Sequence, residues 1–520
     1  MALDFAPTQE QQAIIDAIVG TKSNLFVPAK AGCAKTSSVQ FACRAMSPCS
    51  ALYLAFNKKN ADEAKEVLPD WVTTKTFNAL GHAALAKVLG RKLILDPSKL
   101  FNTTREVFKQ LSIRDQELFS AVTNLLSAIR KLPFVPNVIV GMKYKSLVEE
   151  TQDLWDELFD TAGVPATLDP KDVREVACVV LNIMVSAMKE GKIDYDDQVW
   201  GSVCFHGIFQ PYAVVFVDEA QDLSWLNREQ LRKTGGRLIV IGDPLQAIYQ
   251  FRGADAKSME NIRGLKKPDS WIDLPLNVTF RVPKVLVARQ LSHAPGFTAF
   301  HLNPQGEFLD NLQLPWGPGY VRSLLSHSPS VAILSRNNAP LLTLAFRLIA
   351  AGIAPNYLGR DIGKNLKALV RTICGDRVLP AQEFEHLVEL WREKEIYNAQ
   401  QKGQDSKLDQ INDRADCILA VLASGCLDSE AVQARMDSLF SSKSGMIDLS
   451  TGHKSKGLEW THVFHLDPGS LPSKWAMKAA AEGNPTQMEQ DLNLKYVIET
   501  RAKRTLEYRK SSKDLWDLKA

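Results

Sequence analysis

Short apolar runs alternate along this chain with longer stretches in which apolar residues recur at helical spacing. The run at 212–217 is almost entirely apolar, and a second run at 238–241 follows it closely. Such runs are typical of strands that are buried on both faces of a parallel sheet. The stretches at 104–132 and 173–189 have the period of amphipathic helices. The pattern predicts an α/β protein, and 520 residues predict three or four domains or subdomains.

Two adjacent carboxylates end the run at 212–217, and they carry the strongest chemical signal in the chain. Asp218 and Glu219 follow the predicted strand directly. In parallel sheets, ligands bind beyond the carboxyl ends of the strands. One acid at that position can hold Mg²⁺, and its neighbour can polarise a water molecule for attack on a phosphate. The sequence therefore predicts nucleotide hydrolysis, with Asp218 as a metal ligand and Glu219 as the general base.

A candidate phosphate loop lies upstream, where the apolar run at 25–27 leads into small residues, a Lys-Thr pair and a helical stretch. This is the order of a P-loop, in which backbone amides and the helix N-terminus bind phosphate oxygens. Lys35 would reach the β- and γ-phosphates, and Thr36 would bind Mg²⁺. Ala29 and Ala34 stand where the motif has glycines, and a positive φ at Ala34 would cost about 1 kcal/mol. The predicted ATP contacts are Ala31, Gly32, Cys33, Ala34, Lys35, Thr36 and Ser37.

The segment at 242–254 reads Gly-Asp-Pro-Leu-Gln-Ala-Ile-Tyr-Gln-Phe-Arg-Gly-Ala. It resembles the third motif of the UvrD/Rep/PcrA-like group of superfamily 1 helicases. The resemblance implies that Gln246 senses the γ-phosphate, that Tyr249 and Phe251 stack on bases, and that Arg252 contacts the strand. A polar sensor placed close to an aromatic platform can relay a change in phosphate to a bound base.

Further motifs follow in the order of that family, which chance alone does not supply. The resemblance implies that Gln11 reads adenine, that Arg281 and Arg501 contact the γ-phosphate, and that Glu459 meets the ribose. Thr279 replaces the usual Asn before Arg281, much as Ser does in the eukaryotic F-box helicases. The remaining strand-binding residues implied are Phe56, Asn57, Lys58, Thr76, Phe77, Asn78, Thr451 and His453. Without the family, Phe56 and Phe77 would be read as core residues, and the polar residues as ordinary surface groups.

The resemblance implies two RecA-like parallel-sheet motor domains, each interrupted by a mainly helical insertion. The second insertion is shorter than in the bacterial housekeeping members, so their duplex-binding and autoinhibitory behaviour does not carry over directly. The expected ranges are 1–90 and 206–275 for motor domain 1A, 91–205 for insertion 1B, 276–360 and 443–520 for motor domain 2A, and 361–442 for insertion 2B.

The overall composition limits how the protein can bind nucleic acid and indicates the cellular compartment in which it works. The net charge is only +3, so binding to nucleic acid must come from a local groove. The eight cysteines have no Cys-x-x-Cys pairing, which suits a reducing compartment. We find no apolar stretch of membrane-spanning length and no signal-peptide pattern at the N-terminus. We expect a cytoplasmic, nuclear or nucleoid protein, of cellular or viral origin, without membrane association.

The predicted function is an ATP- and Mg²⁺-dependent DNA helicase or single-strand translocase that works as a monomeric motor. Translocation from 3′ to 5′ is implied by the resemblance alone. Expected partners are single-stranded DNA, single/double-strand junctions, and replication, repair or recombination proteins. Three alternatives stay open: a DNA-stimulated ATPase that strips bound protein without unwinding, a non-catalytic binding module, and an RNA-directed helicase. The two alanines of the loop and the short second insertion motivate the first alternative.

Overall fold

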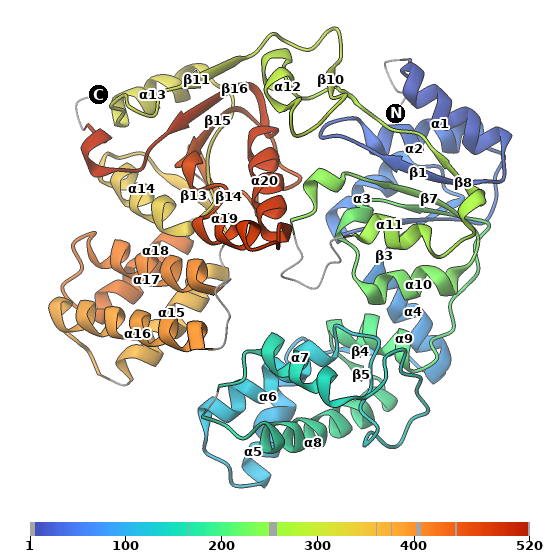
Figure 1. The fold of residues 1–520 in the computed structure, drawn as a ribbon, viewed down its shortest axis with the longest axis horizontal. Helices are drawn as coiled ribbons and strands as arrows, with labels where there is room; N and C mark the ends of the chain where they lie inside the picture. Colours follow the sequence, from blue (N-terminus) through green and yellow to red (C-terminus); the bar gives the residue numbers. More distant parts are fainter. Residues whose placement is uncertain are drawn as a thin grey trace. The chain divides into compact units, whose positions relative to one another are not determined.

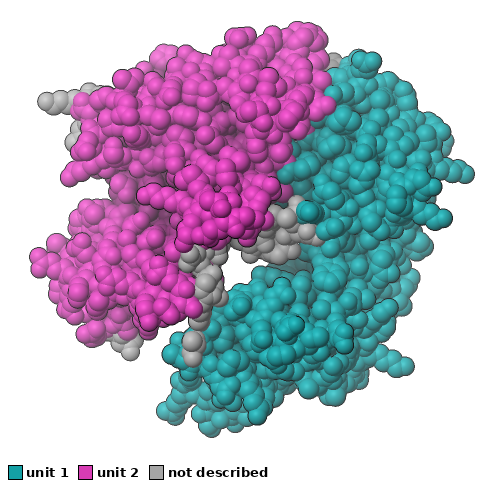
Figure 2. Space-filling model, in the orientation of Figure 1, with its two compact units in different colours: residues 1–29, 34–244, 249–276 teal, residues 30–33, 245–248, 277–520 magenta. Residues whose placement is uncertain are grey.

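The computed structural model describes residues 6–165, 167–248, 257–359, 361–375, 377–401, 407–441 and 445–517. The chain forms two compact units, which Figure 2 shows in different colours. Unit 1 contains residues 1–29, 34–244 and 249–276, and unit 2 contains residues 30–33, 245–248 and 277–520. Among the described residues, no helix combines the length and the apolar character that a membrane crossing needs.

Unit 1 is built on a six-stranded sheet in which every strand pair is parallel. The strand order is β3-β2-β6-β7-β1-β8, and the two central strands, β6 and β7, correspond to the predicted runs at 212–217 and 238–241. Strands β1, β3, β7 and β8 are labelled in Figure 1. The strands are β1 (Asn24–Pro28), β2 (Ala51–Ala55), β3 (Val72–Thr76), β6 (Val214–Val217), β7 (Arg237–Gly242) and β8 (Trp271–Asp273).

Helices connect these strands, as parallel pairing requires. Their apolar residues pack on the sheet in a cluster that includes Leu54, Phe77, Val217 and Val240. The helices of this part are α1 (Gln9–Gly20), α2 (Lys35–Ala45), α3 (Lys58–Val67), α4 (Phe77–Leu89), α10 (Trp225–Thr234) and α11 (Ser258–Arg263).

The first insertion follows α4 and has a hydrophobic cluster that is distinct from the cluster on the sheet. Its apolar stripes, for example at Val173, Ala177, Val180 and Met184 of α8, face this cluster. The predicted helical stretch at 104–132 is divided between two helices. The elements are β4 (Ile94–Leu95), α5 (Lys99–Gln110), α6 (Gln116–Ile129), α7 (Gln152–Ala162), α8 (Pro170–Lys189), β5 (Lys192–Ile193), a π-helical turn (Asp197–Gly201) and α9 (Ser202–Cys204).

Unit 2 contains a second six-stranded sheet, in which all pairs are again parallel. The order is β11-β16-β15-β12-β14-β13. The strands are β11 (Glu307–Asp310), β12 (Val331–Ser335), β13 (Pro355–Leu358), β14 (Ile447–Thr451), β15 (Trp460–Leu466) and β16 (Ala502–Arg509). A separate short pair is formed by β9 (Val278–Thr279) and β10 (Thr298–Ala299).

The described residues of the second insertion form four helices, and its apolar residues belong to the same cluster as those of the sheet. Phe384 and Ile418 of the insertion are in that cluster together with Ile333 and Phe464 of the strands. The insertion helices are α15 (Asp361–Cys374), α16 (Ala381–Gln401), α17 (Leu408–Leu422) and α18 (Ser429–Ser441). The other helices of unit 2 are α12 (Lys284–Gln290), α13 (Pro318–His327), α14 (Asn338–Ala350), α19 (Lys474–Ala481) and α20 (Thr486–Glu499).

The predicted fold class is confirmed, because each unit has a parallel sheet with connecting helices and a helical insertion. The domain limits that were expected from the motifs stay a prediction.

Candidate nucleotide site and strand-binding motifs

Three neighbouring strands of unit 1 bring the predicted nucleotide residues to one edge of the sheet. Pro28 of β1 is in register with Gly242 of β7, and β7 also pairs with β6. Because the strands are parallel, their carboxyl ends lie at the same edge. The phosphate loop follows β1, Asp218 follows β6, and Asp243 follows β7. The parallel pairing of these strands therefore brings together residues that are far apart in the sequence.

The end of the predicted phosphate loop has a left-handed backbone conformation, although the residue there is alanine. Ala34 has φ 54° and ψ 46°, and it immediately precedes the first residue of α2. This left-handed conformation costs an L-residue about 1 kcal/mol relative to its usual conformations. No side chain among the described residues caps the start of α2. Its amides and helix dipole therefore suit an anion such as a phosphate.

Lys35 is held in the site by the predicted general base. Its ammonium Nζ lies 2.7 Å from Oε1 of Glu219, and both side chains are largely shielded from solvent. Burial would lower the pKa of Lys35, but the charges of Glu219 and Asp218 outweigh it and raise the pKa. Lys35 therefore stays positively charged, as a phosphate ligand must be.

Asp218 is oriented by a tyrosine that sequence analysis missed. The hydroxyl of Tyr53 donates to Oδ2 of Asp218 at 2.6 Å, and the backbone amide of Glu219 donates to Oδ1 at 2.9 Å. Burial and the charge of Glu219 raise the pKa of Asp218, while Lys35 opposes the shift. Thr36 also hydrogen-bonds Tyr53, so both predicted metal ligands share this partner. The tyrosine hydroxyl within the otherwise apolar strand β2 is the feature of the sequence that could have indicated this contact.

Gln221 connects the carboxylate of Glu219 to the end of β7. Its Nε2 donates to Oε2 of Glu219 at 2.5 Å, and its Oε1 accepts from the backbone amide of Asp243 at 3.0 Å. Glu219 itself has φ 50°, a left-handed conformation that is uncommon outside glycine. Strained backbone of this kind is often found at functional sites. The arrangement fixes both the backbone and the carboxylate of the predicted base.

The donor set of this edge fits a magnesium-bound nucleoside triphosphate. Loop amides and Lys35 are phosphate donors, while the hydroxyl of Thr36 and the carboxylate of Asp218 are the hard oxygen ligands that Mg²⁺ takes. Gln11, the predicted adenine contact, is fully buried, and its amide already bonds Thr8 and Ser38. Its role in reading adenine stays a prediction.

Within unit 2, two of the predicted γ-phosphate residues lie together. Nη2 of Arg501 is 3.5 Å from Oε1 of Gln246, and Arg501 is 1 % exposed. The guanidinium also donates to the carbonyl oxygens of Val497 and Leu458. The ammonium of Lys456, which sequence analysis did not single out, donates to the carbonyl oxygen of Gln246 at 2.7 Å.

The other two predicted nucleotide residues of unit 2 form an ion pair with each other. Nε of Arg281 lies 2.6 Å from Oε2 of Glu459, and Lys503 adds a second cation at 3.4 Å. Burial would raise the pKa of Glu459, but these two cations outweigh it and lower the pKa. A Cβ atom on Gly32 would come within 2.7 Å of the Arg281 side chain, so a larger residue does not fit there.

The tip of the phosphate loop clusters with unit 2 and is fixed by its backbone. Gly32 accepts a hydrogen bond from the amide of Phe280 at 2.9 Å. The amide of Ala31 donates to the hydroxyl of Tyr496 at 2.9 Å. Tyr496 lies on α20, shortly before Arg501 in the chain, and the sequence alone did not indicate this contact.

The first strand-binding motif is exposed, as a nucleic-acid contact must be. Phe56 is 40 % exposed, and Asn57 and Lys58 are exposed as well. The side chain of Asn57 also caps α3, because its Oδ1 accepts from the amide of Asn60.

The second predicted strand-binding motif lies at the start of α4. Phe77 is 4 % exposed and packs in the core of the sheet, so its ring is not at the surface where a base could stack on it. Thr76 caps α4 through its hydroxyl. Asn78 bonds to the segment that returns from the first insertion. The apolar face of α4 carries Phe77 inward, and the role of Phe77 in strand binding stays a prediction.

The last strand-binding motif lies at the end of β14, where Thr451 is buried and His453 is half-buried. Tyr249, Phe251 and Arg252 lie outside the described residues. The roles of all these residues in strand binding stay predictions.

Comparison with known families agrees with the geometry over most of the chain. The family described as UvrD/REP helicase N-terminal domain matches residues 8–266. The family described as UvrD-like helicase C-terminal domain matches residues 359–512. The chain belongs to the UvrD/Rep helicase family. The resemblance seen in the motifs is therefore confirmed.

Curated relatives of this UvrD-like chain include F-box DNA helicase protein 1 of Schizosaccharomyces pombe, at 24 % identity over 96 % of the chain and 57 % of that protein. F-box DNA helicase 1 of Gallus gallus is 26 % identical over 48 % of the chain and 24 % of that protein. RecBCD enzyme subunit RecB of Borreliella burgdorferi is 32 % identical over 21 % of the chain and 9 % of that protein. The chain thus spans just over half of the yeast relative and less of the others.

Proposed function

We propose that the chain is an ATP-dependent DNA helicase or single-stranded DNA translocase that moves from 3′ to 5′. The observation that carries the proposal is the arrangement at the edge of the unit 1 sheet. There, Lys35 pairs with Glu219 at 2.7 Å, next to a buried Asp218 and an uncapped helix N-terminus. Membership of the UvrD/Rep family supports a helicase, and the DNA helicase names of the relatives support DNA as the substrate.

Each residue has a proposed task at the nucleotide. Lys35 and the loop amides hold phosphate oxygens, and Thr36 and Asp218 would hold Mg²⁺. The metal, when bound, supplies Lewis-acid stabilisation of the charge that develops on the phosphate oxygens. Gln246, Arg281 and Arg501 would contact the γ-phosphate, where cations offset transition-state charge.

Glu219 is the proposed general base, and its partners suggest how substrate engages it. Lys35 and Gln221 both bind its carboxylate. A triphosphate competes with Glu219 for the ammonium of Lys35, because both are anions within reach of the same group. The carboxylate is then able to accept a proton from water, while Gln221 still holds its second oxygen in place.

We assign the two motor domains and two insertions to the ranges expected from the motifs. Closure and reopening around ATP would move the strand through exposed contacts such as Phe56 and Lys58. Single-stranded DNA and its junctions with duplex are the proposed substrates. Replication, repair or recombination proteins are the proposed partners, with action in a nucleus, nucleoid or cytoplasm.

The chemistry is tested by the ATPase rate with and without a single-stranded oligodeoxynucleotide. Lys35→Ala and Glu219→Gln should each abolish the strand-stimulated turnover, with losses of about 100-fold or more. Lys478→Ala removes an exposed lysine of α19 that pairs with Glu482, so it serves as the matched charge control and should match the wild type. A Glu219→Gln variant with near-full turnover would mean that another group is the base.

Direction and product are tested together on partial duplexes that carry a 3′ tail or a 5′ tail. Strand separation from the 3′ tail alone is the expected result, and unwinding confined to the 5′ tail would reverse the polarity. ATP hydrolysis that displaces a bound protein without separating strands would indicate a remodelling ATPase. Stronger stimulation by RNA than by DNA would indicate an RNA-directed enzyme.

A further inference from the structure

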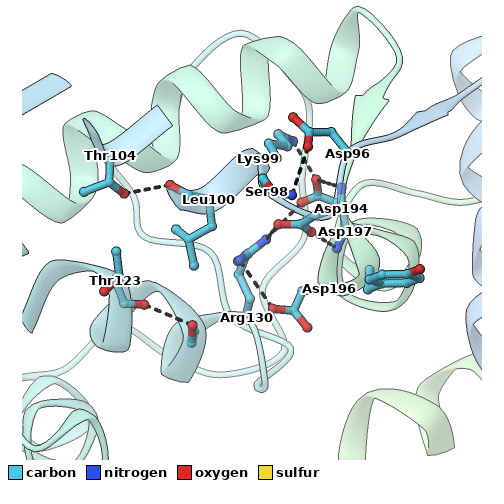
Figure 3. Close-up of polar contacts among 12 residues, drawn as sticks. Asp96, Ser98, Lys99, Leu100, Thr104, Thr123, Arg130, Asp194, Asp196 and Asp197 are labelled. Atoms are coloured by element: carbon cyan, nitrogen blue, oxygen red, sulfur yellow. Dashed lines mark hydrogen bonds and ion pairs between the residues drawn. The ribbon is translucent and has the colours of Figure 1, made fainter. Parts of the chain in front are cut away.

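The segment at 194–204, here named the return segment, leads from the first insertion back to the motor sheet and holds a buried ionic cluster. Figure 3 shows the cluster, in which Lys99 and Arg130 meet Asp194, Asp196 and Asp197. Lys99 begins α5 and Arg130 ends α6, so both cations come from the first insertion. All three carboxylates come from the return segment.

The contacts within the cluster are short and mutually supporting. Nζ of Lys99 lies 2.5 Å from Oδ2 of Asp197, and Nη1 of Arg130 lies 2.6 Å from Oδ2 of Asp194. The amide of Asp197 donates to Oδ1 of Asp194, and the amide of Asp194 donates to Oδ2 of Asp197. The cluster thus fixes the backbone of the return segment as well as its side chains.

Burial makes this geometry specific. The side chains of Lys99, Arg130 and Asp197 are 4 %, 1 % and 2 % exposed. Buried ion pairs gain little net stability, because desolvation offsets the attraction, but they tolerate few alternative arrangements. The cluster also leads into the π-helical turn at Asp197–Gly201, a rare conformation that is frequent at functional sites.

The return segment also contacts the second predicted strand-binding motif, which lies at the start of α4. Nδ2 of Asn78 donates to the carbonyl oxygen of Tyr195 at 2.9 Å and to Oε1 of Gln198 at 3.0 Å. Nε2 of Gln198 lies 3.2 Å from Nδ1 of His82, one helical turn further along α4. Both amide hydrogens of Asn78 are therefore used, and its carbonyl oxygen is the group that it can offer to a strand. An acceptor suits N–H donors of bases rather than phosphate.

A glycine lets α4 and the return segment approach closely enough for these bonds. A Cβ atom on Gly81 would lie 1.9 Å from the carbonyl oxygen of Gln198 and 2.8 Å from the hydroxyl of Ser202. Both are too close for any larger residue. The helix that carries Asn78 is therefore seated directly on the π-helical turn.

We propose that Gln198 is a positioning residue for strand binding, and that it acts by holding the amide of Asn78. The ionic cluster of the first insertion holds Gln198 in turn, through the shared backbone of Asp197 and Gln198. The insertion thereby sets the geometry of a strand-binding motif in the motor. This inference rests on the proposed strand-dependent ATPase. It assigns to Gln198 and the first insertion a role in positioning the strand contact of that enzyme.

The test measures ATPase turnover against the concentration of a mixed-sequence single-stranded oligodeoxynucleotide. Gln198→Ala should raise the half-saturating strand concentration about fivefold to tenfold, the worth of one or two hydrogen bonds. The maximal rate should change less than twofold. Asn182→Ala is the matched control, because Asn182 makes comparable side-chain hydrogen bonds to the loop at 138–140 of the same insertion. It should leave both values as in the wild type.

A double-mutant cycle separates positioning from a general structural effect. If Gln198 acts through Asn78, the double variant with both alanines should bind the strand no more weakly than Asn78→Ala alone. Additive losses, or a fall of maximal rate together with melting temperature, would overturn the inference.

The ionic cluster is tested at its exposed member, where folding is not at risk. The side chain of Asp196 is 53 % exposed and lies 3.3 Å from Nη2 of Arg130. Asp196→Asn should raise the half-saturating strand concentration about twofold. An unchanged value for both Asp196→Asn and Gln198→Ala would overturn the inference. A wild-type chain that no strand stimulates would instead refute the proposed function.

Discussion

The two helical insertions are joined to their sheets by different physical means. The first has a hydrophobic cluster that includes Leu85 of α4 and Leu226 of α10 rather than the strands of the sheet, and its return segment is fixed by buried ions and amide bonds in addition to this apolar packing. The second shares one cluster with its sheet, so Phe384 and Phe464 belong to the same core. Polar joints depend on a few partners in fixed directions, while apolar cores spread their energy over many contacts.

This difference indicates how each insertion can act on its motor. A joint made of a few directed bonds can transmit a small displacement to a defined residue such as Asn78. A shared core makes the insertion part of the sheet's own packing, so the two move and unfold together. We therefore expect substitutions in the first joint to act through a few residues, however large the cost, and substitutions in the second core to weaken the insertion and the sheet together.

The ionic cluster of the return segment is the polar joint of the first insertion, and Arg130 is the cation that pairs with all three of its carboxylates. The largest expected effect comes from removing this cation. Arg130→Met keeps the bulk of the side chain but leaves Asp194 and Asp197 as buried carboxylates with one cation fewer. We expect a loss of about 5 kcal/mol in the free energy of unfolding, measured by urea titration.

Arg232→Met is the control for this substitution, because Arg232 pairs with Glu229 on a half-exposed side chain. It should cost less than about 1 kcal/mol. If Arg130→Met lowers the free energy of unfolding no more than this control does, the ionic cluster does not stabilise the attachment of the first insertion. The proposed difference between the two insertions would then be wrong.

Truncation inside the shared core should cost slightly less but should spread further. Phe384 is fully buried in the second insertion, and Phe384→Ala should lower the free energy of unfolding by about 4 kcal/mol. Hydrogen exchange is the sharper measurement. Protection should fall in β12 and β15 as well as in α16, because all three contribute to one cluster. A loss confined to the insertion helices would show that the insertion is an independent folding unit.

The sequence predicts apolar structure and strand ends better than it predicts polar joints. The run at 212–217 indicated β6, and the acids after it are placed at the sheet edge as expected. The left-handed conformation at Ala34 also follows from its place in the motif. Tyr53 was missed because its partner Asp218 is distant in the sequence, and pairwise contacts between distant residues leave no periodic trace. Phe77 lies in the core, which is the position that its apolar side chain indicated before the family resemblance was considered.

A smaller effect is expected where the second insertion contributes a polar contact of its own. Oδ1 of Asp413, on α17, accepts from the amides of Asn338 and Ala339 at 2.8 and 2.9 Å, and thereby caps α14. Asp413→Ala should cost about 1–2 kcal/mol, the usual worth of an N-terminal cap. Asp416→Ala, one turn along the same helix, removes an exposed partner of Arg392 and serves as the control in the same titration. A loss of about 5 kcal/mol from Asp413→Ala would show that the second insertion also depends on a polar joint.

The smallest expected effect is the change in the free energy of unfolding with pH, which should have opposite signs for the two regions. Burial raises the pKa of Asp197 above its ordinary value of 3.8, so its contribution to stability is present at low pH and is lost as the pH rises. The pKa of Glu507, on β16, is lowered from 4.5 because hydrogen bonds from His462, Asn311 and Tyr320 outweigh burial. Its contribution is present above that value and is lost as the pH falls.

Urea unfolding between about pH 3 and pH 7 tests both signs, at about 1.4 kcal/mol for each unit of pKa shift. The stability advantage of the wild type over Asp197→Asn should shrink as the pH rises above 3.8. Its advantage over Glu507→Gln should shrink as the pH falls below 4.5. Because the two slopes have opposite signs, a shift common to the whole chain cannot imitate the result. If both stability differences shrink as the pH falls, Lys99 and Arg130 outweigh the burial of Asp197 and lower its pKa. The ionic cluster would then behave like the hydrogen-bonded network around Glu507.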